Sequence, residues 1–167
     1  MNLDNFLCWF QSFDVQLDHV RVQHCPKSGF GLYSTKKITE QQILLLSIPQ
    51  KLFIKPNACE NENFSGFEQL ISFLLENPTN PYVEFLKSIE TVPQWRRNPT
   101  ENYPKQLSDP MKIHDEKYLL SRQKFAQYSD ELFQWAYYSI NTRCVHFDMQ
   151  IESKQSDDNL CLIPFLG

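Results

Sequence analysis

The chain has 167 residues, of which 41% are hydrophobic, 14% aromatic and 22% charged. This composition excludes a disordered chain, because it is rich in the large side chains that offset conformational entropy on folding, and the length suits one domain or part of one. The net charge of −4 at pH 7 provides no basic field for a phosphate backbone, so we expect no direct binding of nucleic acid.

The first segment of the chain predicts an amphipathic helix over residues 2–14. Its apolar side chains recur at helical spacing, at Leu3, Phe6, Leu7, Phe10 and Phe13. We interpret this stripe as ordinary core packing rather than as an anchor for a membrane or a partner. Val20 and Val22 then alternate with polar residues, which predicts a short strand.

A glycine pair comes next, between two runs of β-type residues. Gly29 and Gly31 flank an aromatic residue, which favours either a turn with positive φ or a backbone that approaches another group closely. We predict a short strand over residues 32–35 and a buried strand over residues 42–48. The third glycine of a dinucleotide-binding fingerprint is missing, because Ser34 stands where it would fall. From the residues alone a hairpin explains the pair best, with close approach to a ligand as the alternative.

Helical spacing dominates the middle of the chain, where an apolar stripe begins at Phe67. Pro81 suits the first turn of the next short helix. Four prolines then predict that no long element forms, at positions 93, 99, 104 and 110. We predict one helix from Asp115 onward, and a second that is capped by Ser129 and ends near Arg143.

The spacing of cysteine and histidine residues indicates whether the chain could bind a metal ion and whether its cysteines form disulfides. The five cysteines are widely spread and never stand in C-x-x-C spacing, so we expect reduced thiols, an intracellular protein of the nucleus or cytoplasm, and no zinc site. The four histidines show no i, i+3 or i, i+4 pairing. No apolar run approaches the roughly 20 residues that cross a bilayer, so we expect no membrane partner.

Four segments follow one another in a recognisable order. They are the glycine stretch of residues 27–54, the run Pro81-Tyr82-Val83-Glu84-Phe85-Leu86 with Val92-Pro93, the pair Trp135-Ala136 with Asn141-Thr142-Arg143-Cys144-Val145, and the run Leu162-Ile163-Pro164-Phe165-Leu166. Together they resemble the SET-domain protein methyltransferases of the branch that includes plant Rubisco large-subunit methyltransferase. The resemblance implies an α+β fold in one partial SET domain over residues 1–167. Short N-terminal SET strands would occupy residues 20–56, a largely helical insert residues 66–145, and the start of the C-terminal SET strands residues 160–167.

The same resemblance implies S-adenosylmethionine as cofactor and a lysine-containing protein as substrate. Gly29 and Gly31 would lie beside the cofactor. The segment whose backbone would hydrogen-bond the cofactor is Gln42, Ile43 and Leu44. Arg143 would clamp the carboxylate of the cofactor through two parallel hydrogen bonds. From the residues alone, Arg143 equally favours the dipole of its helix or reaches toward water.

In the family, an aspartate, an asparagine-histidine pair and a catalytic tyrosine follow the position of Leu166, whereas here Gly167 follows. We therefore assign no catalytic residue and no metal ligand within the chain, and expect little or no activity from it alone. The predicted function is that of a protein-lysine N-methyltransferase family member, with a histone or non-histone substrate. The alternative is a non-catalytic SET remnant that binds protein. The choice of lysine or histidine as target and the oligomeric state stay open.

Overall fold

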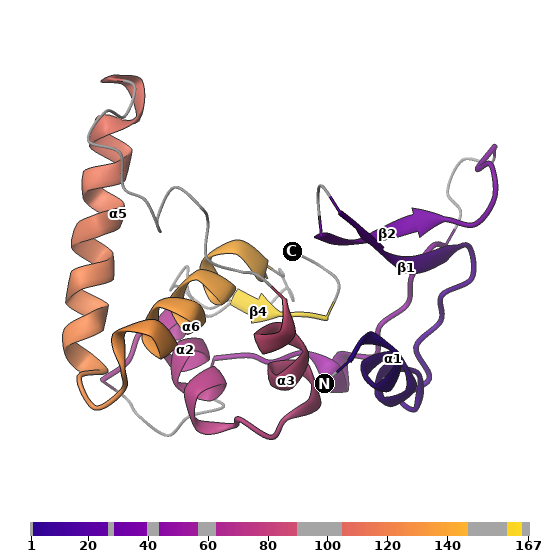
Figure 1. Cartoon of the computed structure of the whole chain (residues 1–167), viewed down its shortest axis with the longest axis horizontal. Coiled ribbons are helices and arrows are strands. Elements are labelled where there is room, and N and C mark those ends of the chain that lie inside the picture. The colour runs from indigo at the N-terminus through magenta and orange to yellow at the C-terminus, as the bar shows by residue number, and fades with distance from the viewer. Residues whose placement is uncertain are drawn as a thin grey trace, which may run out of the picture.

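The computed structural model of the chain is a mixture of helices and short antiparallel strands, as the α+β prediction requires (Figure 1). The structure describes residues 2–26, 29–39, 44–56, 63–89, 105–146 and 160–164. Within these ranges the helices are α1 Leu3–Gln11, α2 Gly66–Glu76, α3 Pro81–Ser88, α5 Lys105–Lys124 and α6 Asp130–Arg143, with one 3₁₀ turn, η1 Gln50–Leu52. The strands are β1 Val20–Cys25, β2 Gly29–Ser34, β3 Cys144–His146 and β4 Leu160–Leu162.

Capping residues fix where four of the helices begin. The side chain of Asn2 accepts a backbone N–H of α1, and Ser65 forms a complete capping box at the start of α2. Asn80 caps α3, whose first residue is Pro81, and Ser129 caps α6. The predicted roles of Pro81 and Ser129 are therefore confirmed.

The core forms where α2 packs against α6 and α1 packs against α3 (Figure 1). Phe6 and Phe10 of α1 are fully buried, which confirms that the N-terminal stripe is core. The other largest fully buried side chains are Leu70, Ile71, Leu74, Val83, Leu86, Phe125, Phe133, Ile140, Leu162 and Ile163. These residues come from α2, α3, α6, β4 and the loops beside them, so the middle and the end of the sequence share one core.

Two separate antiparallel sheets hold the strands. The hairpin β1–β2 runs in register from Val20↔Ser34 to Cys25↔Gly29, and β3 pairs with β4. A single bridge adds Ile54 to β4, through hydrogen bonds of 3.1 and 2.9 Å with the backbone of Leu162. The segment before α2 is thus tied to the segment after β3.

Two predictions about elements are wrong. The strand expected over residues 42–48 does not form in its described part, where Leu44 and Leu45 are 54% and 36% exposed and a lone bridge joins Ser47 to Gln16. Helix α5 begins ten residues before the predicted start at Asp115 and continues through Pro110. It stands out from the body of the molecule (Figure 1). Contacts of its second half with α2 and α6 outweigh the local penalty of a proline.

Among the described helices, none has the length and apolar content needed to cross a lipid bilayer.

Candidate functional site

Arg143 stands at the junction where α6 ends and β3 begins. Its side chain is half-buried, and its Nε is buried with no hydrogen-bond partner among the described residues. No carboxylate of the described ranges forms an ion pair with it. A buried N–H of a cation without an acceptor is unfavourable, so this position calls for a negatively charged or carbonyl oxygen.

Tyr82 of α3 is the ionisable neighbour of Arg143. Burial raises the pKa of the Tyr82 hydroxyl well above its ordinary value of 10.0, and the positive charge of Arg143 only partly opposes that shift. The hydroxyl therefore stays protonated near neutral pH. Tyr82 is a neutral neighbour, so it does not compensate the charge of Arg143, and no ion pair does so within the described ranges.

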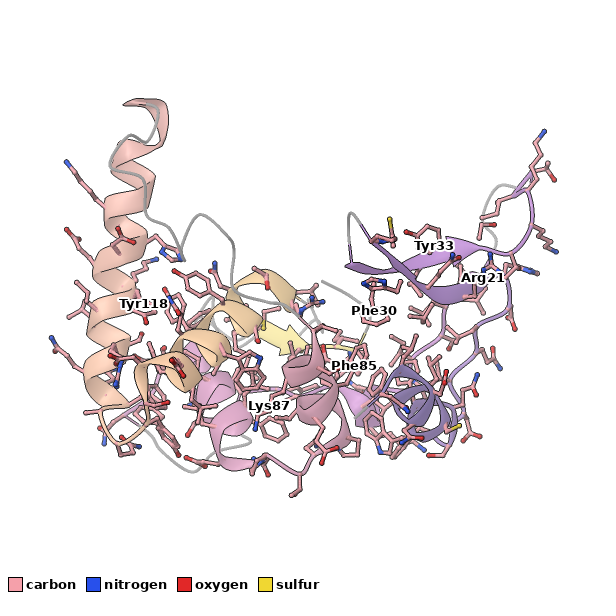
Figure 2. The ribbon with its side chains drawn as sticks, viewed as in Figure 1. Arg21, Phe30, Tyr33, Phe85, Lys87 and Tyr118 are labelled. Atoms are coloured by element: carbon pink, nitrogen blue, oxygen red, sulfur yellow. The ribbon has the colours of Figure 1, made fainter. Side chains whose placement is uncertain are left out.

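Helix α3 also connects the Arg143 region with the glycine hairpin. Phe30, between the two glycines, points toward α3, where its ring lies 5.7 Å from that of Phe85 (Figure 2). Phe85 is also stacked on Phe6 of α1 at 4.2 Å, and it follows Tyr82 by three residues, about one helical turn. The hairpin and Arg143 thus border the same turn of the same helix.

Both glycines lie inside β2, opposite Cys25 and Gln23 of β1. The hairpin that the sequence favours is confirmed, but the expectation of a positive φ is wrong for Gly31, which has extended strand geometry. A Cβ at Gly31 would meet the Tyr33 ring at 3.3 Å, a contact with the end of a side chain. The pair therefore serves strand pairing in the described structure.

Of the other predicted cofactor contacts, Leu44 alone is among the described residues. Leu44 lies in an irregular, exposed segment, which corrects the expectation of a buried strand at that position. Gln42 and Ile43 lie outside the described residues.

A cavity of about 1190 Å³ opens among α2, α5, α6 and β4, and Arg143 itself is not one of its lining residues. Asn141 and Cys144, on either side of Arg143 in the sequence, line it. Thr142 donates a hydrogen bond of 2.7 Å to the carbonyl of Tyr138, so its hydroxyl completes the end of α6. Burial, then the neighbouring Cys161, raises the pKa of the Cys144 thiol to about 12, so that thiol is a poor nucleophile at neutral pH.

The same cavity contains an ion pair that the sequence analysis missed. Glu68 is 5% exposed and accepts a hydrogen bond of 2.7 Å from Lys124 Nζ. The local signal of Glu68 was visible, because it is the fourth residue of the capping box that Ser65 begins. Nothing local predicted Lys124 as its partner, nor Tyr82 as the neighbour of Arg143.

Aromatic side chains of α6 serve the core. Tyr137 and Tyr138 are 3% and 2% exposed, as the packing interpretation predicts, although Tyr137 also reaches the wall of the cavity. Within the described ranges, no three His, Cys, Asp or Glu side chains lie where they could hold a metal ion together.

Comparison with known proteins adds no relative: no protein-family model, no curated protein and no solved structure matches the chain significantly. The geometry around Arg143 and the fold class therefore carry the functional argument.

Proposed function

We propose that the chain is a member of the SET-domain protein-lysine N-methyltransferase family and forms the front part of a site for S-adenosylmethionine. In their described parts, the segments that resemble family motifs include β2, the start of α3, the last residues of α6 and the end of β4. The observation that carries the proposal is Arg143, whose Nε is buried and lacks an acceptor among the described residues.

The residues at this position fit the cofactor. The amino-acid end of S-adenosylmethionine bears a carboxylate, and a guanidinium can donate two parallel hydrogen bonds to such a group. Arg143 would hold and orient that carboxylate, while the neutral Tyr82 leaves its charge available. When bound, the cofactor supplies an electrophilic methyl group. The backbone of the Gly29 and Gly31 strand and of residues 42–44 would complete the contacts from this chain.

We assign no catalytic residue to these 167 residues. A polypeptide of this sequence is expected to bind the cofactor weakly and to transfer no methyl group to histones or other proteins. Turnover on a lysine-containing protein in a radiolabelled methyl-transfer assay would contradict this expectation.

The decisive test compares two ligands that differ at the carboxylate. S-adenosylhomocysteine carries the amino-acid end, whereas 5′-methylthioadenosine lacks it. Calorimetric titration should show that Arg143→Gln weakens binding of S-adenosylhomocysteine about 10- to 100-fold, the range for one hydrogen bond between charged groups. Binding of 5′-methylthioadenosine should stay unchanged.

The matched control is Arg21→Gln, because Arg21 is exposed on β1 of the hairpin (Figure 2). It should leave both affinities unchanged. Absence of S-adenosylhomocysteine binding at millimolar concentration, or equal losses in the two variants, would rule out the cofactor site.

The second candidate is a non-catalytic module that binds protein. It is favoured by apolar side chains that α5 exposes to solvent: Ile113, Leu119 and Leu120 are 55%, 59% and 63% exposed. A chain that binds neither adenosine ligand would leave this candidate as the better explanation.

A further inference from the structure

A second cavity, of about 620 Å³, lies away from the larger one, between α1, the segment after η1 and the start of α3. Aromatic and aliphatic side chains form most of its wall. They are Trp9, Phe13, Leu52, Phe53, Ile54, Pro56, Phe73, Pro81 and Tyr82. Its volume falls in the range of roughly 300 to 1,000 Å³ that small-molecule sites occupy. The wall therefore suits the apolar body of a small ligand.

The charged side chains among the described residues of this wall have one sign. Lys51 and Lys55 line it, and no Asp or Glu is among its lining residues in the described part of the chain. Lys51 Nζ lies 5.1 Å from the centre of the Phe13 ring, so the ammonium group sits at the edge of the aromatic wall.

The backbone N–H groups at the start of α3 add no free donor to this wall, whose other polar groups there are the Asn80 amide and the Tyr82 hydroxyl. Asn80 Oδ1 accepts the N–H groups of Tyr82 at 2.9 Å and Val83 at 3.4 Å, and Pro81 has no N–H. Selection between an anion and a cation depends on the charge of Lys51, which attracts the first and repels the second.

We propose that this cavity binds a small amphiphilic carboxylate, with its hydrocarbon part against Trp9 and Phe13 and its carboxylate beside Lys51. The ligand is distinct from a lysine-containing substrate, because a positively charged side chain would meet Lys51 there. The proposal does not rest on the proposed methyltransferase function, although Tyr82 lies both in this wall and near Arg143.

Three ligands of equal chain length test the proposal: octanoate, octanamide and octylammonium, which are anionic, neutral and cationic. Each is titrated into the whole ¹⁵N-labelled chain, and the indole N–H signals of Trp9 and Trp135 are followed. Trp9→Phe and Trp135→Phe assign them, because Trp95 gives a third indole signal. Octanoate should shift the Trp9 signal to saturation and leave the Trp135 signal in place. Octanamide should bind about fivefold more weakly, the upper range for an exposed ion pair. Octylammonium should bind about fivefold more weakly again, because the charge of Lys51 repels it.

Lys51→Met separates the charge from the packing, because methionine keeps most of the apolar stem. It should weaken octanoate binding about fivefold and leave octanamide binding unchanged. Lys87→Met is the matched control, since Lys87 Nζ also lies over an aromatic ring, 5.4 Å from the centre of Trp135, outside this cavity. It should not affect octanoate.

Several results would overturn the proposal. If octanamide or octylammonium binds as tightly as octanoate, the lysine charge does not select the ligand. If the ligands shift the Trp135 signal instead of the Trp9 signal, they do not bind in this cavity. Tighter binding of an acidic peptide such as acetyl-Glu-Leu-Phe-amide would replace the small molecule with a protein partner. If Lys51→Met fails to fold, the contrast among the three ligands on the unmodified chain still decides.

Discussion

Glu68 ties α2 to α5, and we predict that Glu68→Gln destabilises the fold. One carboxylate oxygen accepts hydrogen bonds from Ser65 N at 2.9 Å, Ser65 Oγ at 3.1 Å and Lys124 Nζ at 2.7 Å. The other accepts from Ser121 Oγ at 3.2 Å. Two of these four donors belong to α5, more than fifty residues away in the sequence, so the carboxylate links local capping to tertiary packing.

The expected loss is about 2 kcal/mol. Glutamine preserves the shape, but it has one acceptor oxygen and no charge, so the bond from Lys124 loses its ionic part and at least one serine donor loses its acceptor. Splitting a fully buried ion pair costs about 3–5 kcal/mol. The Lys124 side chain is 44% exposed and keeps its solvation, so the loss of one charged hydrogen bond, about 1.5–3 kcal/mol, is the better measure. For a chain of this size that lowers Tm by about 4–8 °C.

The effect should depend on pH with a definite sign. Burial favours a higher pKa for Glu68, but the hydrogen bonds from Lys124 and Ser65 outweigh it and hold the pKa below its ordinary value of 4.5. The carboxylate therefore contributes stability above pH 4.5, and this contribution disappears as the pH falls toward the pKa of the folded state. The stability gap between the unmodified chain and Glu68→Gln should close in acid.

Urea denaturation from pH 7 down to pH 3 measures both effects. Glu116→Gln is the matched control, because Glu116 is exposed on α5, and it should change stability by less than about 0.5 kcal/mol. Equal losses for the two variants at pH 7, or a gap that persists unchanged at pH 3, would refute the assigned role of Glu68.

Two further predictions concern the packing around the proposed sites. Arg122→Met removes a hydrogen bond of 2.8 Å to Asp130 and two bonds to carbonyls of the turn between α5 and α6, so we expect about 2 kcal/mol of destabilisation and faster amide exchange in that turn. Phe6→Ala removes a fully buried ring 4.2 Å from Phe85 and should cost about 3–5 kcal/mol in urea denaturation, well above the loss for the partly exposed Phe30→Ala.

Helices were predictable from the sequence wherever their signals are local. The spacing of apolar residues near Phe67, the proline at position 81 and the cap at Ser129 each act within a few residues, and α2, α3 and α6 form as they indicate. The start of α5 was not predictable in this way, because Pro110 argues locally against a helix, while the contacts that anchor the helix join its second half to Glu68 and α6.

A strand forms only when another segment pairs with it, and a local sequence pattern does not predict which segment that is. The apolar run from Leu44 looks like a buried strand, yet in the described structure its backbone meets only Gln16, through Ser47. Ile54, beyond the predicted strand, instead pairs with Leu162 near the end of the sequence. An apolar run therefore predicts a tendency to be buried, while the fold decides which run finds a neighbouring strand.

Local sequence patterns predict helix α3 itself but not the regions of the candidate site that it connects. The cap at Asn80 and the fixed φ of Pro81 determine where the helix begins, and so they set the directions of Tyr82 and Phe85, one turn apart. Tyr82 borders the smaller cavity and lies near Arg143, whereas Phe85 receives Phe30 from the hairpin. One rigid turn of α3 connects these three regions. A change in the position of α3 would therefore alter the surroundings of Arg143, of the glycine strand and of the smaller cavity together.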